Sequence, residues 1–487
     1  MGDFRPDFGR VEEKAQELLE KHHLPGLALG AVVEGEPAWQ GAWGWADIAG
    51  KTAMTPEHRQ RIASITKTQV GLTAMSLIEE ARFSLDSRVQ ELLPDIPLKG
   101  QCDSLAVRHL LTHTGGIGEA PNIEDITKAF DKLFGESEPG KTLAELYKDG
   151  ITVEAAPGSK WCYANHGFTL LGEIISRMEG VPLHEAVERR VYEPLGMTNT
   201  DLRDEPHPGL SKGYTQAPTP EAKALIELLG IQLESEEPDD GWNMPGKFVR
   251  VWGNPAAGGV QSTIPDMLRY ASALLRKSDG IVSDEAFEQM TSPQYQQDPR
   301  LDAWGLAFMV QRPFGVRQFG HGGAAFGGWN SFMAVYPELN AAFVIHLNMW
   351  REDFDNKVQA PLIKAYLRAE DVAAAECEIE PQVLETAPGV YELPGKFPLT
   401  DFRTRFNPGR VMISRDGDGL TLRGQRGAAA GGAALAPADA NDPDLMYLMG
   451  PAPSKIVLLR DGGGAVTGLR FQHLFELVKN PELQPWT

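Results

Sequence analysis

The sequence predicts a mixed α/β (α+β) fold: an antiparallel sheet flanked by helices, a helical subdomain beside it, and a small all-β domain after it. β-like runs lie at both ends of the first 370 residues, helical patterns lie between them, and the pattern after residue 371 is again β-like. A sheet assembled from distant segments accounts for the first two observations. At 487 residues the chain exceeds the usual size of one domain, so we expect domains at 1–370 and 371–487.

The N-terminal part predicts a helix, a hairpin and further helices. Apolar side chains recur at helical spacing until Pro25-Gly26 ends the pattern. Two β-like runs then flank the short segment Glu34-Gly35-Glu36, which fits a hairpin. The expected elements are a helix at 8–24, strands at 27–33 and 37–46, a helix at 64–82, and several helices within 100–200.

The strands that complete the sheet come much later in the chain. A long, Pro-rich and acidic stretch at 215–250 comes first, and its length favours a surface insertion or lid over a plain connection. The expected later elements are strands at 304–311, 318–320, 331–336 and 341–347, then a closing helix at 356–369.

The C-terminal region predicts a small all-β module, either a barrel or a sandwich, because short β-like runs alternate with Gly, Asp and Pro turns. The low-complexity Ala/Gly segment at 427–438 is expected to be a loose loop. The expected strands are 391–397, 403–406, 410–414, 420–423, 456–460 and 467–472.

Composition argues against several classes of partner. The net charge of -21 repels nucleic-acid phosphates and anionic lipid, so we expect a small-molecule substrate and no nucleic acid. No apolar run is long enough to span a membrane. The polar start indicates a cytoplasmic protein, or a secreted or periplasmic one if a signal peptide has been removed. No metal or cofactor is expected, and the oligomeric state stays open.

Three cysteines are too few and too scattered for a disulfide framework, and we expect them to be reduced and mostly packed in the core.

The segment Ser64-Ile65-Thr66-Lys67 is the central chemical observation and the single S-x-x-K of the chain. Residues i and i+3 share one helix face, so the hydroxyl of Ser64 and the amine of Lys67 can meet. The positive end of the helix dipole favours negative charge developing on Ser64. Burial can depress a lysine pKa by several units from about 10.4, which makes Lys67 a usable base.

The second motif is Tyr163-Ala164-Asn165, which follows a Pro157-Gly158 turn and precedes an expected helix at 168–178. A tyrosine here can relay a proton to a leaving group. The Asn165 amide can orient the lysine or the substrate.

The third motif is His321-Gly322-Gly323, expected between a β-like run at 316–320 and a Gly-rich stretch. Gly322 and Gly323 would let a substrate backbone approach closely. The backbone amides of Ala324 and Ser64 would then form an oxyanion hole. His321 would position a substrate carbonyl or the tyrosine.

Taken together, in this order and spacing, the three motifs resemble the serine β-lactamase and penicillin-binding-protein superfamily. The similarity is greatest to the branch of class C β-lactamases, D-aminopeptidases and family VIII carboxylesterases, and it spans about residues 8–369. Two framework segments, 108–116 and 255–263, also resemble that branch. The C-terminal module resembles the barrel-like domain appended to some D-aminopeptidase-like members.

The resemblance implies a role for each matching residue. Ser64 would be the acylated nucleophile, Lys67 its general base, Tyr163 the proton relay and Asn165 a hydrogen-bonding support. His321-Gly322-Gly323 occupies the place of the family's K-T-G triplet. A histidine there is more similar to the esterases and peptidases of the family than to its efficient β-lactamases.

Two further candidates were weighed. Gly209-Leu210-Ser211-Lys212-Gly213 matches the G-x-S-x-G nucleophile elbow, but a Pro-rich loop precedes it where a strand is required. Trp252 and Phe326 are candidates for lining an acyl pocket, although such aromatic residues more often fill a core.

We therefore predict a serine hydrolase that cleaves an ester or amide through a Ser64 acyl-enzyme and is esterase-like or D-amino-acid-amidase-like. A β-lactamase or an acyltransferase of the same fold is the alternative within this chemistry. A slowly acylated penicillin-binding or sensor protein is the alternative from another class.

Overall fold

The computed structural model describes most of the chain. Most of the predicted insertion at 215–250 and the expected strand at 403–406 lie outside the described residues. The described ranges are 4–118, 142–203, 205–216, 239–240, 243–246, 255–325, 327–370, 373–394, 410–425, 431–450, 453–471 and 475–486.

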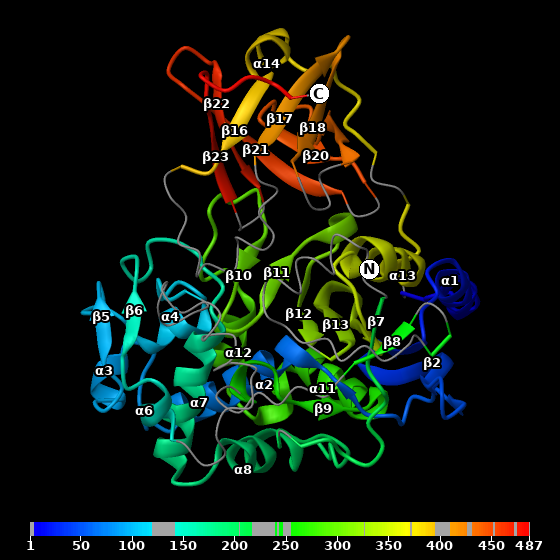
Figure 1. Ribbon diagram of the computed structural model, residues 1–487, viewed down its shortest axis with the longest axis vertical. Coiled ribbons are helices and arrows are strands. Elements are labelled where there is room, and N and C mark those ends of the chain that lie inside the picture. The colour runs from blue at the N-terminus through cyan, green and yellow to red at the C-terminus, as the bar shows by residue number, and fades with distance from the viewer. Residues whose placement is uncertain are drawn as a thin grey trace.

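An antiparallel eight-stranded sheet forms the centre of the large unit, in the order β10-β11-β12-β13-β14-β1-β2-β3 (Figure 1). β1 joins the two halves of the sequence, because it pairs with β2 on one side and β14 on the other. The strands are β1 (Gly26–Val33), β2 (Glu36–Asp47), β3 (Thr52–Ala53), β10 (Ala303–Trp304), β11 (Met309–Gln311), β12 (Gln318–Ala325), β13 (Trp329–Tyr336) and β14 (Ala341–Leu347).

Alternating side chains of the sheet enter two separate cores. Leu29 and Ile345 pack in a cluster with α1 (Phe8–Lys21) and α13 (Ala360–Leu367). Ala28 and Val344 face the other side and pack against α2 (Thr66–Glu79) and α11 (Ile264–Leu275). Helices therefore cover both faces of the sheet, as the sequence predicts.

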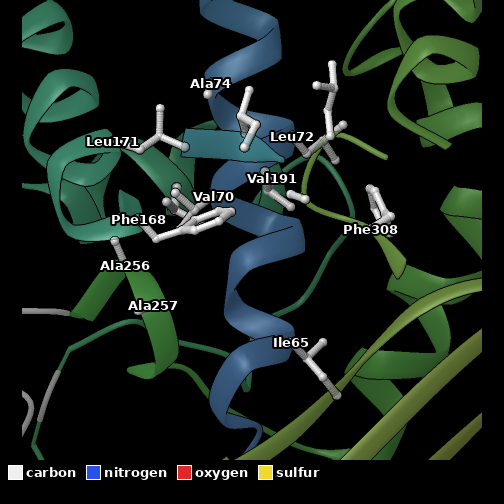
Figure 2. Packing of buried hydrophobic residues seen from close by; sticks show 14 of the residues in the cluster. Ile65, Val70, Leu72, Ala74, Phe168, Leu171, Val191, Ala256, Ala257 and Phe308 are labelled. Atoms are coloured by element: carbon white, nitrogen blue, oxygen red, sulfur yellow. The ribbon is translucent and has the colours of Figure 1, made fainter. Parts of the chain in front are cut away.

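Helix α2 runs through the larger core, and almost all of its side chains are buried. Figure 2 shows apolar residues from distant segments, including Phe168, Ala256 and Phe308, surrounding it. A helix buried on all sides is held in place by tertiary packing. The N-terminus of α2 is consequently fixed relative to the sheet.

The helical subdomain lies at one side of the sheet (Figure 1). Its helix α7 (Asn165–Glu179) begins at the second motif and ends at Gly180, whose φ of 70° suits glycine at a helix C-terminus. The neighbouring elements are α3 (Val89–Leu92), β5 (Leu98–Gly100), α4 (Val107–Leu111), α6 (Leu143–Leu146), β6 (Ile151–Val153) and α8 (Leu183–Val187).

A closed antiparallel barrel follows the large unit, with β16 pairing to β23 to complete the ring. Its centre is filled by apolar side chains of the strands and of α14 (Pro381–Thr386). The strands are β16 (Gly389–Glu392), β17 (Val411–Asp416), β18 (Gly419–Gly424), β19 (Ala433–Pro437), β20 (Leu445–Leu448), β21 (Ser454–Arg460), β22 (Val466–Phe471) and β23 (Phe475–Lys479).

Several local expectations were wrong. The segment 427–438 was expected to be a loose loop, but β19 lies within it, because pairing with β18 and burial of Leu435 outweigh the weak strand preference of Ala and Gly. The strand expected at 304–311 is two short strands, β10 and β11, joined by a turn. The sequence did not predict β20 or β23.

The cysteines were also only partly predicted. None of the three forms a disulfide, but Cys162 alone is buried, Cys102 is half-buried and Cys377 is exposed. Among the residues that the structure describes, no helix combines the length and the apolar character needed to cross a membrane.

Candidate active site

Ser64 lies at the entrance to the buried helix. It sits in the short 3-10 turn Ala63–Ile65, which runs directly into α2. The preceding Ala63 has a φ of 46°, a left-handed backbone conformation that is uncommon for a residue other than glycine. Ser64 is half-buried between buried neighbours, so its hydroxyl is held in one place while staying accessible.

Lys67 points back at Ser64 from the first turn of α2. Its Nζ lies 3.0 Å from Ser64 Oγ, 2.8 Å from Asn165 Oδ1 and 2.6 Å from the carbonyl oxygen of Ala257. The side chain is completely buried, and the ring of Tyr163 lies 4.9 Å from Nζ. Three acceptors on three different segments therefore fix the position of this amine.

The segment 255–263 forms hydrogen bonds with residues on either side of Ser64. Thr66 Oγ1 accepts a hydrogen bond from the amide of Val260, and the carbonyl of Val260 accepts one from the amide of Ile62. Strands β4 (Gln60–Arg61) and β9 (Gln261–Ser262) extend this pairing. The carbonyl of Ala257, which sequence reasoning did not identify, is thereby aimed at Lys67.

Tyr163 and Asn165 enter the site at the start of α7. Tyr163 is buried, and its ring stacks on His113 with centroids 4.1 Å apart and planes 25° apart. His113 Nδ1 accepts a hydrogen bond from the amide of Ala164, and its carbonyl accepts one from the amide of Cys162. His113 thus holds the backbone on both sides of the tyrosine. It lies within framework segment 108–116, and that was the one signal in the sequence that pointed to it.

His321 faces the same group from the sheet. Its ring centroid lies 6.2 Å from that of Tyr163, and its Nδ1 lies 2.6 Å from the carbonyl oxygen of Gly322. Burial lowers the pKa of His321 to about 3, and the positive charge of Lys67 acts in the same direction. Nδ1 therefore carries the proton, and Nε2 is a buried acceptor without a hydrogen-bond partner among the described residues.

The glycines that follow His321 are part of β12, which corrects the expectation that they lie after a strand. A Cβ on Gly323 would lie 2.3 Å from the carbonyl oxygen of Ile62, so this contact requires glycine. Ser331 Oγ, on β13, donates a hydrogen bond to the same carbonyl. β12 is therefore held against the turn that carries Ser64, and Ala324 is exposed next to Gly323.

An aromatic cluster closes the rear of the site. Trp304 is buried, and its ring lies 4.9 Å from that of His113, 5.5 Å from that of His321 and 6.1 Å from that of Tyr163. Trp161 packs in the same cluster. Trp252 and Phe326, the two predicted pocket residues, lie outside the described residues.

The structure thus brings together Ser64, Lys67, Tyr163, Asn165 and His321, which sequence analysis had selected from segments far apart in the chain. A family model described as Beta-lactamase matches residues 11–368. The chain belongs to the beta-lactamase family. The resemblance predicted from the motifs is confirmed.

One curated relative in this family is the Beta-lactamase of Escherichia coli K12, which is 25% identical over 278 residues. That match covers 56% of this chain and 62% of the relative's own length. The family framework is therefore shared over only part of each protein.

Two solved structures share the fold. The octameric penicillin-binding protein homologue from Pyrococcus abyssi is 22% identical with a TM-score of 0.60, covering 97% of this chain and 100% of that one. The D-amino acid amidase from Ochrobactrum anthropi SV3 is 24% identical with a TM-score of 0.61, covering 74% of this chain and 98% of that one. These similarities confirm the fold class predicted for this chain.

Proposed function

We propose that this protein is a serine hydrolase that cleaves small esters or D-amino-acid-type amides through an acyl-enzyme on Ser64. The observation that carries the proposal is the distance of 3.0 Å between Lys67 Nζ and Ser64 Oγ inside a buried setting. When Lys67 gives up the proton with which it binds Ser64 Oγ, its neutral amine keeps two N–H donors and gains one lone pair. With the donors on Asn165 and Ala257, the lone pair of Lys67 faces the hydroxyl of Ser64.

The first half-reaction forms the acyl-enzyme. Lys67 takes the Ser64 proton as Oγ attacks the substrate carbonyl carbon, and the amides of Ser64 and Ala324 stabilise the resulting oxyanion. The bond to the leaving group then breaks, and that group receives a proton through Tyr163. Tyr163 is suited to this relay because its ring lies 4.9 Å from Lys67 Nζ and 6.2 Å from the ring of His321.

In the second half-reaction, water attacks the acyl carbon and passes a proton to the same relay. The carbon–Oγ bond breaks and Ser64 regains its proton. The free acid leaves, so the two steps consume one water molecule. An alcohol in place of water would give acyl transfer by the same steps.

His321 supports an ester or amide substrate over one that carries a carboxylate. In the family's K-T-G triplet, a cationic lysine occupies this position. His321 is neutral at physiological pH, because burial lowers its pKa to about 3. A neutral acceptor cannot form an ion pair with a substrate carboxylate, but it can accept a hydrogen bond from a neutral group.

A short substrate panel tests the proposal. Initial rates are measured on a short-chain aryl ester, a D-alanyl anilide and a chromogenic cephalosporin, with Ser64→Ala as the control. We expect ester or D-alanyl cleavage that depends on Ser64, with a much slower cephalosporin rate. A dominant cephalosporin rate would refute the role assigned to His321. Persistent acylation without turnover would favour the slowly acylated sensor.

A further inference from the structure

The C-terminal barrel contacts the large unit at the loop that precedes Trp304 (Figure 1). Arg300 Nη1 donates to both carboxylate oxygens of Asp442 at 3.1 Å. Arg470 Nη1 donates to the carbonyl of Gln297 at 3.4 Å and lies 3.8 Å from Asp298 Oδ2. Two barrel residues of opposite charge therefore hold one loop.

Apolar packing reinforces these polar contacts. Leu301 is 6% exposed and forms a cluster with Leu445 and Val457 of the barrel. The burial of Leu301 depends on the barrel, because both of its buried partners in the cluster belong to the barrel. The loop is thus anchored by charge at 298–300 and by burial at 301.

The anchored loop is closed on itself and ends at the aromatic cluster. The amide of Trp304 donates to the carbonyl of Tyr295 at 2.8 Å, and the amide of Tyr295 donates to the carbonyl of Trp304 at 2.9 Å. Asp298 lies inside this closed loop, where Arg300 binds both of its carboxylate oxygens at 2.8 Å. The loop that the barrel anchors is therefore directly continuous with the paired residues Tyr295 and Trp304.

Trp304 connects the loop to the candidate site. It is 1% exposed, and its ring packs against those of Tyr163 and His321. The hydrogen bonds of Lys67 with Ser64, Asn165 and Ala257 do not involve Trp304, whereas the packing of Tyr163 and His321 does.

We propose that the C-terminal barrel braces the rear wall of the candidate active site. Asp442 and Arg470 are positioning residues that fix residues 295–302, and these in turn hold Trp304 against Tyr163 and His321. The barrel is therefore part of the working site, although none of its residues is required to touch the substrate.

Hydrogen exchange of the full-length protein tests the brace without any assumption about turnover. The double variant Asp442→Asn/Arg470→Gln removes both polar anchors at no change in net charge. We expect peptides covering 294–305 to exchange about tenfold faster than in the wild type. The control Glu392→Gln/Arg410→Gln removes an ion pair of the same barrel away from the loop and is expected to leave this exchange unchanged.

The catalytic consequence rests on the proposed function. For the ester or amide that the wild type cleaves, the double variant is expected to lower kcat about fivefold with KM within about twofold, because the change reaches the reaction through the packing of Trp304 against Tyr163. The midpoint of thermal unfolding of this double variant is expected to stay near that of the control Glu392→Gln/Arg410→Gln. Asp442→Glu, which keeps the charge, is expected to retain most of the rate. If the double variant folds poorly, the single variants give the same exchange comparison.

Unchanged exchange at 294–305 in the anchor variants, or equally fast exchange in the control pair, would overturn the brace. A wild type without turnover would overturn the proposed function, and the exchange comparison would still decide the brace.

Discussion

Ser64 and Ser211 each lie in a serine-hydrolase motif, S-x-x-K and G-x-S-x-G, yet their surroundings differ in every respect that matters for nucleophilic attack. Ser64 is half-buried, opens a buried helix and faces the amine of Lys67 at 3.0 Å. Ser211 is 2% exposed, and its Oγ accepts a hydrogen bond from Trp329 Nε1.

The backbone around Ser211 also lacks the form of a nucleophile elbow. The residues after Ser211 lead into β7 (Tyr214–Gln216) and not into a helix, and the adjacent Lys212 lies 3.6 Å from Asp239. A motif therefore supplies residue types, while the surrounding fold supplies the base and the access.

The largest expected effect separates the two serines directly. Ser64→Ala is expected to lower kcat about 10⁴-fold or more, because the nucleophile is lost. Ser211→Ala is expected to keep kcat within about twofold and to lower the free energy of unfolding by about 1 kcal/mol, because the buried indole N–H of Trp329 loses its acceptor. Steady-state rates and urea unfolding measure both. Equal rates for the two variants would contradict the comparison.

A smaller effect tests whether Lys67 is the base that distinguishes Ser64 from Ser211. Asn165→Asp places a negative charge 2.8 Å from the amine and stabilises its protonated form. We expect kcat/KM at neutral pH to fall about 100-fold and to recover as the pH is raised. Asn165→Leu removes the acceptor without adding charge, so its loss is expected not to recover. A recovery that is the same in both variants would exclude Lys67 as the base.

His321 is expected to contribute less, through the acceptor Nε2. His321→Leu removes the acceptor and is expected to lower kcat/KM about tenfold, whereas His321→Gln keeps a neutral acceptor and stays within about threefold. Steady-state rates of the two variants and the wild type on the preferred ester or amide measure these effects. Equal losses would show that His321 acts through packing alone.

The smallest effect concerns stability at acid pH. Burial lowers the pKa of His346 to about 3, below its ordinary value of 6.5, so the unfolded state binds more protons between these values. The neutral buried form contributes full stability above pH 6.5, and this contribution is lost as the pH falls through that window. At pH 5 the loss amounts to about 2 kcal/mol.

His346→Leu is expected to remove this loss. Urea unfolding at pH 8 and pH 5 should show a difference in unfolding free energy about 2 kcal/mol smaller than in the wild type. Replacement of His184, whose side chain is 35% exposed, serves as the control. A wild-type pH dependence retained in His346→Leu would contradict the assignment.

The sequence predicted the parts of the site that depend on short-range geometry. Ser64 and Lys67 meet because residues three apart share a helix face, and Asn165 opens the helix that follows Tyr163. It did not predict the Ala257 carbonyl, because a backbone acceptor 190 residues from Lys67 has no residue-type signature. The contact between Trp304 and His321 was also not predicted, since it depends on how β10, β11 and β12 are arranged in the sheet.

The same distinction between local and long-range features applies to the fold. The hairpin of β1 and β2 and the strand β14 were predicted from local alternation and turn residues. The turn between β10 and β11 and the strand β19 were missed, because their partners in the sheet and the barrel decide their conformation.

The most direct test of the central claim is peptide mapping by mass spectrometry after treatment with a fluorophosphonate, which forms a stable phosphonyl ester with an activated serine. We predict one adduct, on the peptide that carries Ser64, and its loss in Lys67→Met while Ser211→Ala is labelled at the wild-type rate. An adduct on Ser211, or labelling that persists in Ser64→Ala, would contradict the assignment of Ser64 as the nucleophile.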